Sequence, residues 1–327
     1  MTDVEKSSKT TSKPWPLWKK LAIAGSITAV AIALAVGLGV GLTRHHSSSS
    51  SSDDDAPPTD TNTNTTRTST WRPSVNTTWQ IILGNPVDPS SLSTPPVPIW
   101  DIDLYENPSS TIDLLHRQKA HVICYFSAGS YEDWRADKND FQASDIGANL
   151  KGWKGEKWIK LSSPSVRAIM AKRIKSASDK GCDAIDPDNV DGYLVNNGVG
   201  LTKQDSIDYV KFLAGEAKKY NMSIGLKNAG EIIPDVIDVV DFSVNEQCVQ
   251  MKECETFAQF IKKRKPVFNI EYPDGAPDVR DDKAREICAH EGASAGSEGF
   301  GQVMKKMGLD GWVRYCDGRS YVTKTKG

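Results

Sequence analysis

Short apolar runs alternate with helical patterns along most of this 327-residue chain, from Trp71 to Gly327. Such alternation is typical of a parallel sheet covered by helices, and about 250 residues is the usual length of a (β/α)8 barrel. We therefore predict an α/β fold for residues 71–327, a TIM-like (β/α)8 barrel. One strand candidate is in excess and is expected in a loop or an added hairpin. The candidates are Trp79–Leu83, Ile99–Leu104, Val122–Ser127, Trp158–Leu161, Ala184–Asp186, Ser223–Lys227, Phe242–Asn245, Val267–Glu271 and Trp312–Tyr315.

Helix signals separate most of these strands. Ser163 followed by Pro164 begins one helix, and Gly181 ends it. Thr202 and Asp205 resemble a capping box at the start of another helix. Further helices are predicted near Ser109–Lys119, Cys254–Lys263, Asp281–His290 and Glu298–Met307.

The N-terminal part has a different composition. Residues 1–20 are polar and basic, and residues 21–42 carry no charge over 22 positions. As a helix that segment would be about 33 Å long, enough to cross a bilayer core. We predict an uncleaved signal anchor; a cleaved secretory signal, whose apolar region usually has about 7–15 residues, is the alternative. Lysines before the span favour a cytoplasmic N-terminus, which predicts a single-pass type II membrane protein at the cell membrane, with the rest extracellular or luminal.

Residues 43–70 are rich in Ser and Thr and hold too few apolar side chains to fold. This composition predicts a disordered, O-glycosylated stalk. Sequons at Asn64, Asn76 and Asn221 fit an extracytoplasmic glycoprotein. The net charge of −2 names no class of partner, no nucleic acid is expected, and the oligomeric state stays open.

All six cysteines follow the predicted anchor, and an even number in a secreted context favours disulfides. The spacing alone cannot choose among the fifteen pairings. Our prediction is Cys124–Cys182, Cys248–Cys254 and Cys288–Cys316. A buried free thiol is the alternative, and for Cys124 the two are equally favoured. No Cys or His spacing resembles a zinc site, so neither metal nor cofactor is expected.

Acidic residues gather where predicted strands end. The segment Gly181–Tyr193 places four carboxylates between Asp183 and Asp191, where an apolar strand runs into a loop rich in turn residues. In a parallel barrel the carboxyl ends of the strands meet on one face. Carboxylates there, together with Trp and Tyr side chains, predict a carbohydrate site. Each acid also has a structural interpretation, as a cap, a turn or an ion pair, which for Asp183 and Asp191 is the more favoured one.

Five motifs carry a resemblance to a known family. They are Trp100–Leu104, Val122–Arg135, Asp186–Tyr193, Gly225–Asn228 and Asn245–Cys248. In this order they resemble glycoside hydrolase family 114, which contains endo-α-1,4-polygalactosaminidases with a TIM-barrel-like fold. The resemblance implies a catalytic pair at Asp188 and Glu246 and a cationic galactosamine-containing polysaccharide as substrate. The substrate-binding residues then expected are Asp101, Asp103, Tyr125, Trp134, Asp186, Lys227, Asn228, Glu271 and Tyr272.

The mechanism we expect is retaining. Asp188 would be the nucleophile, kept ionised by Lys227, and Glu246 would be the general acid and then the base, with a raised pKa. Two other functions are alternatives. A type II Golgi glycosyltransferase would use Asp186-Pro-Asp188 as an Asp-x-Asp metal site, and a non-catalytic glycan-binding protein would hold the polymer without cleaving it.

Overall fold

The computed structural model describes residues 69–88 and 96–326, which belong to one compact unit, Thr68–Gly327. The predicted tail, the predicted anchor at residues 21–42 and nearly all of the predicted stalk lie outside the described residues. Among the helices of the described part, none combines the length and the apolar character needed to cross a membrane.

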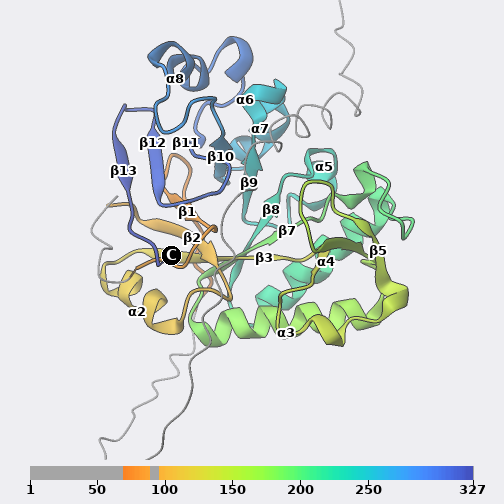
Figure 1. The fold of residues 1–327 in the computed structure, drawn as a ribbon. Helices are drawn as coiled ribbons and strands as arrows, with labels where there is room; N and C mark the ends of the chain where they lie inside the picture. The colour runs from red at the N-terminus through yellow and green to blue at the C-terminus, as the bar shows by residue number, and fades with distance from the viewer. Residues whose placement is uncertain (1–68, 89–95, 327) are drawn as a thin grey trace, which may run out of the picture. The chain divides into compact units, whose positions relative to one another are not determined.

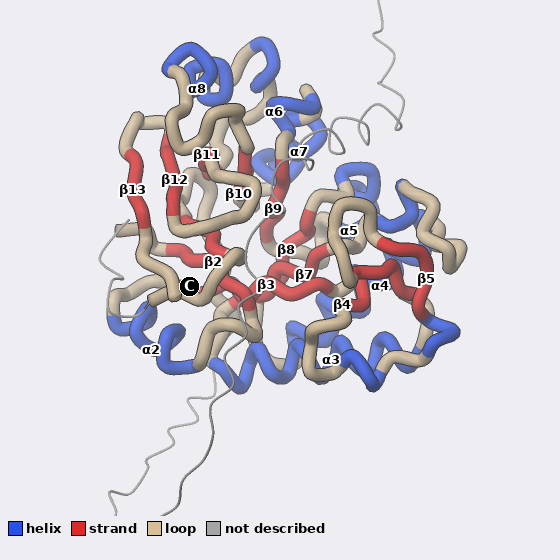
Figure 2. The backbone as a smooth tube through the Cα atoms, viewed as in Figure 1, coloured by secondary structure: helices blue, strands red, loops and turns tan. Residues whose placement is uncertain are grey.

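The main sheet has ten strands, and Figure 2 shows it curving through the unit. The strand order is β1-β2-β3-β7-β8-β9-β10-β11-β12-β13. Their bounds are β1 Gln80–Ile82, β2 Ile99–Asp103, β3 His121–Ser127, β7 Ala184–Asp188, β8 Ser223–Lys227, β9 Phe242–Glu246, β10 Val267–Glu271, β11 Gly301–Met304, β12 Trp312–Tyr315 and β13 Ser320–Val322.

The first eight of these strands pair in parallel, and β12 and β13 are added antiparallel. Every residue of β2, β8 and β10 is buried, as expected for parallel strands covered on both faces. The α/β prediction is confirmed. Within the described residues β1 and β11 are not paired as strands. Two side-chain hydrogen bonds connect this region: Trp79 Nε1 donates to Gly301 O at 2.7 Å, and Tyr315 Oη donates to Trp79 O at 2.9 Å.

The helices are α2 Ser109–Arg117, α3 Pro164–Lys180, α4 Lys203–Lys218, α5 Ile233–Val236, α6 Cys248–Met251, α7 Cys254–Lys262 and α8 Asp281–Cys288 (Figure 1). Local signals set two of them correctly. Helix α3 begins at Pro164 and ends at Gly181, whose φ of 98° closes the last turn. Helix α4 begins with the predicted capping box, because Thr202 Oγ1 and the Asp205 carboxylate each accept from the other's main-chain N–H.

The predicted helix Glu298–Met307 is wrong. This segment holds β11, which pairs with Phe268–Glu271 of β10 in register. Gly301 lies so close to the start of β1 that a Cβ there would be 2.8 Å from Thr77 O. Contacts with distant strands therefore override the helical spacing of the segment, because a buried parallel ladder satisfies its main chain.

The excess strand candidate belongs to a separate insert. Half of Trp158–Leu161 lies in β6 (Glu156–Ile159), the middle strand of an antiparallel sheet with β4 (Ser130–Glu132) and β5 (Ile146–Asn149). We call residues 128–161 the β4–β6 insert. It follows β3 directly, so it lies at the carboxyl end of the parallel strands.

All three predicted disulfides are confirmed. Cys124–Cys182 joins β3 to the turn before β7, Cys248–Cys254 links α6 to α7, and Cys288–Cys316 connects the end of α8 to the turn after β12. The alternative of a free Cys124 is excluded.

Candidate active site

Three neighbouring strands end in charged side chains that meet. Asp188 ends β7, Lys227 ends β8 and Glu246 ends β9, and β8 lies between the other two in the sheet. Lys227 Nζ is 3.3 Å from Asp188 Oδ2 and 3.4 Å from Glu246 Oε2. Burial alone would lower the pKa of Lys227, but the two carboxylates outweigh it and hold the pKa well above its usual value. One ammonium group therefore joins the two acids.

Asp188 receives two more hydrogen bonds. Tyr125 Oη, from β3, donates to Asp188 Oδ2 at 3.0 Å. The main-chain N–H of Asn189 donates to Asp188 Oδ1 at 2.7 Å. Burial and the nearby Asp188 charge raise the pKa of Tyr125 well above its usual value, so this tyrosine keeps the proton that it donates. Both oxygens of Asp188 are oriented from separate directions.

Glu246 is surrounded by donors. Tyr272 Oη donates to Oε1, Asn228 Nδ2 donates to Oε2 at 3.1 Å, and Asn228 Oδ1 accepts the Glu246 main-chain N–H at 2.9 Å. Burial would raise the pKa of Glu246, but Lys227 and these hydrogen bonds outweigh it and lower the pKa. The raised pKa predicted for Glu246 is therefore wrong for the unliganded protein, because the prediction could not count these donors.

The backbone turns sharply after each of these strands. Asn189, Asn228 and Gln247 follow β7, β8 and β9, with φ of 63°, 49° and 63°. A left-handed conformation is uncommon for a residue other than glycine, although asparagine tolerates it best, and such residues cluster at functional sites. The turn at Asn189 is what aims its own N–H at Asp188.

Asp101 and Asp186 are both fully buried, and their charges interact with each other and with Lys227. Burial raises the pKa of Asp101 well above its usual value and that of Asp186 to about 7. The pair retains a proton near neutral pH, which limits the negative charge that Lys227 must balance. This placement does not support the sugar contact predicted for either residue, because neither has exposed surface.

Two of the other acids have distinct surroundings. Burial and the charge of Asp188 raise the pKa of Asp191 to about 6. Asp183 lies at the opposite end of β7, where its Oδ2 is 2.8 Å from His116 Nε2 and accepts the Val122 N–H at 2.8 Å.

Three predicted substrate-binding residues do not join the group. The Asp103 carboxylate binds Arg135 Nη2 at 2.7 Å and the Tyr105 main-chain N–H at 2.7 Å. Trp134 is 49% exposed in the β4–β6 insert. Glu271 accepts the Val249 N–H at 2.8 Å and so holds the start of α6. Asp103 and Glu271 end parallel strands at the same edge of the sheet as the site, yet their carboxylates have other partners.

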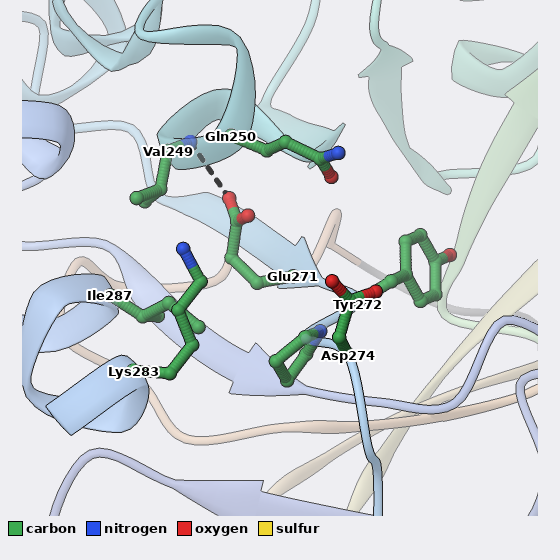
Figure 3. A pocket seen from close by; sticks show the side chains of 8 residues that line it. Val249, Gln250, Glu271, Tyr272, Asp274, Lys283 and Ile287 are labelled. Carbon is green, nitrogen blue, oxygen red and sulfur yellow. Dashed lines mark hydrogen bonds between the residues drawn. The ribbon is translucent and has the colours of Figure 1, made fainter. Parts of the chain in front are cut away.

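Glu271 and Tyr272 line a pocket together with residues of α6 and α8 (Figure 3). In Figure 3 Glu271 points toward Val249, while Tyr272 points away from it. Burial raises the pKa of Glu271 to about 6. Since Tyr272 also binds Glu246, this pocket adjoins the site.

Sequence reasoning missed four side chains behind Asp188: Ser127, Ser130, Glu156 and Asn189. Asn189 had a usable signal, since it follows Asp188 in a turn-rich motif. Ser127 and Ser130 lie in the motif Val122–Arg135, but nothing in the sequence connects them to Glu156, and only the fold brings the three together.

Paired carboxylates at the carboxyl end of a parallel α/β sheet are the arrangement that most glycoside hydrolases use. The comparisons with known proteins agree. Residues 60–321 match the sequence profile of glycoside-hydrolase family GH114, and the chain belongs to that family. The protein is therefore a glycoside hydrolase.

Solved structures extend the comparison. The crystal structure of Aspergillus fumigatus Ega3 in complex with galactosamine is 49% identical, with a TM-score of 0.71, over 77% of this chain and 100% of that one. The glycoside hydrolase domain of PelA from Pseudomonas aeruginosa is 16% identical, with a TM-score of 0.55, over 71% of this chain and 95% of that one, a likeness of fold. No curated protein matches the chain.

Proposed function

We propose that this enzyme cleaves α-1,4-linked galactosamine polymers from within, at deacetylated segments. The observation that carries the proposal is the Asp188–Lys227–Glu246 group, one cation between two carboxylates at adjoining strand ends. The galactosamine in the structure of the 49% identical Ega3 supports the choice of sugar.

Charge favours this substrate class. A free 2-amino sugar is cationic near neutral pH, whereas its N-acetylated form is neutral. Asp188 and Glu246 together outweigh the single charge of Lys227, and Asp191 adds negative charge above about pH 6. A net negative site attracts the cationic sugar and discriminates against the acetylated one.

The proposed mechanism is retaining. Asp188 attacks the anomeric carbon while Glu246 gives a proton to the departing glycosidic oxygen, and the resulting glycosyl ester is hydrolysed by a water that Glu246 deprotonates. Both carboxylates bind Lys227 Nζ within 3.4 Å, so the bound oxygens are at most about 7 Å apart. That limit admits the separation of about 5–5.5 Å that retention uses and only the lower edge of the range of about 6.5–9.5 Å for inversion.

The pH profile follows from Glu246. Its pKa is lowered, so the free enzyme carries less of the protonated acid as the pH rises. Since kcat/KM reports the free enzyme, we expect it to increase by up to about tenfold per unit as the pH falls from 7 toward 5. Measuring kcat/KM on deacetylated oligomers over this range, where the substrate amine stays charged, tests this. A kcat/KM that does not change over this pH range would exclude Glu246 as the general acid.

Product analysis tests the reaction itself. The purified protein is incubated with deacetylated and with N-acetylated polygalactosamine, and the products are analysed by mass spectrometry and, for their anomeric form, by NMR. Internal cleavage of the deacetylated polymer with the anomer retained is the expected result. Monomer release alone, or cleavage restricted to the acetylated polymer, would contradict the proposal.

The alternatives have less support. In the Asp-x-Asp motif, Asp186 is buried against Asp101 while Asp188 binds Lys227, so the two carboxylates do not converge on one metal position. Membership of a hydrolase family favours a catalyst over a non-catalytic glycan-binding protein.

The topology remains part of the proposal: a cytoplasmic tail at residues 1–20, an anchor at 21–42 and a stalk at 43–70 that hold the catalytic domain outside the cytoplasm. Three disulfides support an oxidising compartment. Membrane fractionation tests it, because an anchored chain stays with the membranes in alkaline carbonate, and a chain found in the supernatant would contradict an uncleaved anchor.

A further inference from the structure

A continuous line of hydrogen bonds leads from Asp188 into the β4–β6 insert. The Asn189 N–H binds Asp188 Oδ1 at 2.7 Å, and Asn189 Nδ2 donates to Ser127 Oγ at 2.9 Å. Ser127 Oγ is 2.5 Å from Ser130 Oγ, and Ser130 Oγ donates to Glu156 Oε2 at 2.7 Å. We call these four residues, Asn189, Ser127, Ser130 and Glu156, the Asn189–Glu156 chain. Ser127, Ser130 and Glu156 are all buried, so water does not compete for these bonds.

The chemistry of the two ends determines the direction of every bond. The amide nitrogen of Asn189 can only donate, so Ser127 Oγ accepts there. The hydrogen of Ser127 is then available for Ser130, and the hydrogen of Ser130 for Glu156. An ionised Glu156 can only accept, which makes the last bond charge-assisted and strong. Protonation of Glu156 removes that charge and weakens the bond that orients the hydroxyls.

The main chain ties the same region to Asp188. The N–H groups of Ala128 and Gly129 both donate to Asp188 O at 2.9 Å. The insert and the end of β7 thus meet through fixed main-chain bonds, and the Asn189–Glu156 chain is the side-chain connection between them.

We propose that Glu156 is a positioning residue for catalysis, which acts through Ser130, Ser127 and Asn189 to hold the Asn189 N–H on Asp188 Oδ1. The proposal rests on the proposed role of Asp188 as nucleophile. Glu156 does not touch the reacting atoms; it keeps the nucleophile in the geometry for attack, where small displacements reduce the rate strongly.

The surroundings of Glu156 make this role dependent on pH. Burial raises its pKa to about 7, and the charges of Glu132 on β4 and Asp188 on β7 act in the same direction. The Ser130 hydrogen bond and the charge of Arg135 oppose them. Tyr125 also faces this group from β3 but stays neutral. Glu156 is therefore anionic above about pH 7 and neutral below it.

The test compares Glu156→Gln with the unaltered protein from pH 5 to pH 8.5, on one deacetylated oligomer. Gln is a neutral isostere of protonated Glu156, so the hydrogen bonds from Asn189 to residue 156 in this variant should resemble those of the unaltered protein at low pH. We expect kcat of the variant to be about tenfold lower at pH 8 and nearly equal at pH 5, with KM unchanged throughout. Taking the ratio of the two enzymes cancels the titration of the substrate amine and of Glu246.

Two further variants complete the design. Ser130→Ala interrupts the chain whatever the charge of Glu156, so its kcat should be about tenfold low at every pH. If circular dichroism shows that Glu156→Gln does not fold, Ser130→Ala decides the question at pH 8. Glu216→Gln, at a glutamate on α4 that binds Lys219, is the matched control and should give a ratio of one throughout.

The outcomes separate the two proposals. Normal turnover in Asp188→Asn overturns the proposed function and this inference with it. An inactive Asp188→Asn together with a pH-independent kcat ratio for Glu156→Gln, or with normal turnover in Ser130→Ala at pH 8, overturns the positioning role alone.

Discussion

The aspartates at the two ends of β7, Asp183 and Asp188, differ in the groups that neutralise their charge. Asp183, just before the strand, binds His116 Nε2 and the Val122 N–H, both at 2.8 Å, and lies close to His121. Asp188, at the other end, shares one lysine with a second carboxylate, and its charge acts on the buried Asp101 and Asp186. Asp183 therefore has several hydrogen-bond partners of its own, whereas Asp188 shares the single cation of Lys227 with Glu246. In a parallel α/β sheet, chemistry belongs at the carboxyl end and stability at the amino end.

The largest effect should come from the carboxyl end. Asp188→Asn and Glu246→Gln each remove one of the two carboxylates on which the proposed mechanism depends, so turnover should fall by at least about a thousandfold. Circular dichroism should show a folded protein in both cases, because each amide keeps the shape of the acid. Turnover within tenfold of normal in either variant would exclude that residue from the mechanism.

Removing the shared cation should come next. Lys227→Met leaves two partly buried carboxylates without their partner, which should cost about 3 kcal/mol of stability at pH 7 and reduce turnover about a hundredfold. The folded pKa of Glu246 is lowered, so the stability due to its pairing is present above its unfolded pKa and is lost as the pH falls. Urea unfolding should therefore show that Lys227→Met loses less free energy of unfolding, relative to the unaltered protein, at pH 4 than at pH 7.

The chain offers a matched control for this lysine. Lys305 is also fully buried, but its Nζ binds only uncharged groups, Gln80 Oε1 at 2.9 Å and Asp310 O at 2.7 Å, and burial lowers its pKa to about 7. Lys305→Met should keep turnover within about threefold of normal. Equal losses of turnover in the two variants would mean that Lys227 acts on folding and not on the site.

At the amino end, Asp183→Asn should affect stability and not turnover. Burial opposes ionisation of Asp183, yet the bonds from His116, His121 and the Val122 N–H hold its pKa well below the usual range. Its contribution is thus present at neutral pH and lost as the pH falls below about 3.9, the unfolded value. We expect a loss of about 1–3 kcal/mol at pH 7 that narrows toward pH 2.5, measured by urea unfolding. A change in kcat would contradict the division between the two ends.

The smallest effect should come from the exposed rim of the carboxyl end. If Trp134 stacks on a distant sugar of the polymer, Trp134→Ala should raise KM about two- to fivefold with kcat unchanged. Trp153, 58% exposed in the same insert, serves as the control. An equal rise of KM in Trp153→Ala would show that removing any exposed tryptophan of the insert weakens binding, and would contradict a specific contact between Trp134 and the sugar.

Much of the fold followed from local signals. Helix α3 begins and ends where its caps predict, and helix α4 begins at its predicted capping box. Seven of the parallel strands match apolar runs. The one wrong helix has a physical cause. The segment of β11 has helical spacing, but pairing with the distant strand β10 decided its conformation. The excess strand candidate, Trp158–Leu161, lies partly in the antiparallel strand β6 of the insert, which agrees with the expected added hairpin.

The site divides in the same way. The acids at the ends of β7 and β9 were predictable because parallel strands present their carboxyl ends together, and the motifs marked Asp188 and Glu246. The lowered pKa of Glu246 was not, because it depends on donors from β8 and from beyond β10.

By itself, then, the sequence determined which strands end in acids, where helices are capped, and that an apolar span and a Ser-rich segment precede the folded unit, since these depend on neighbouring residues. Only the tertiary structure decided which acid shares Lys227, which buried pair interacts with it, and that Glu156 reaches Asp188 through two serines. Those properties depend on desolvation and on contacts between strands far apart in the chain, which a linear pattern does not contain.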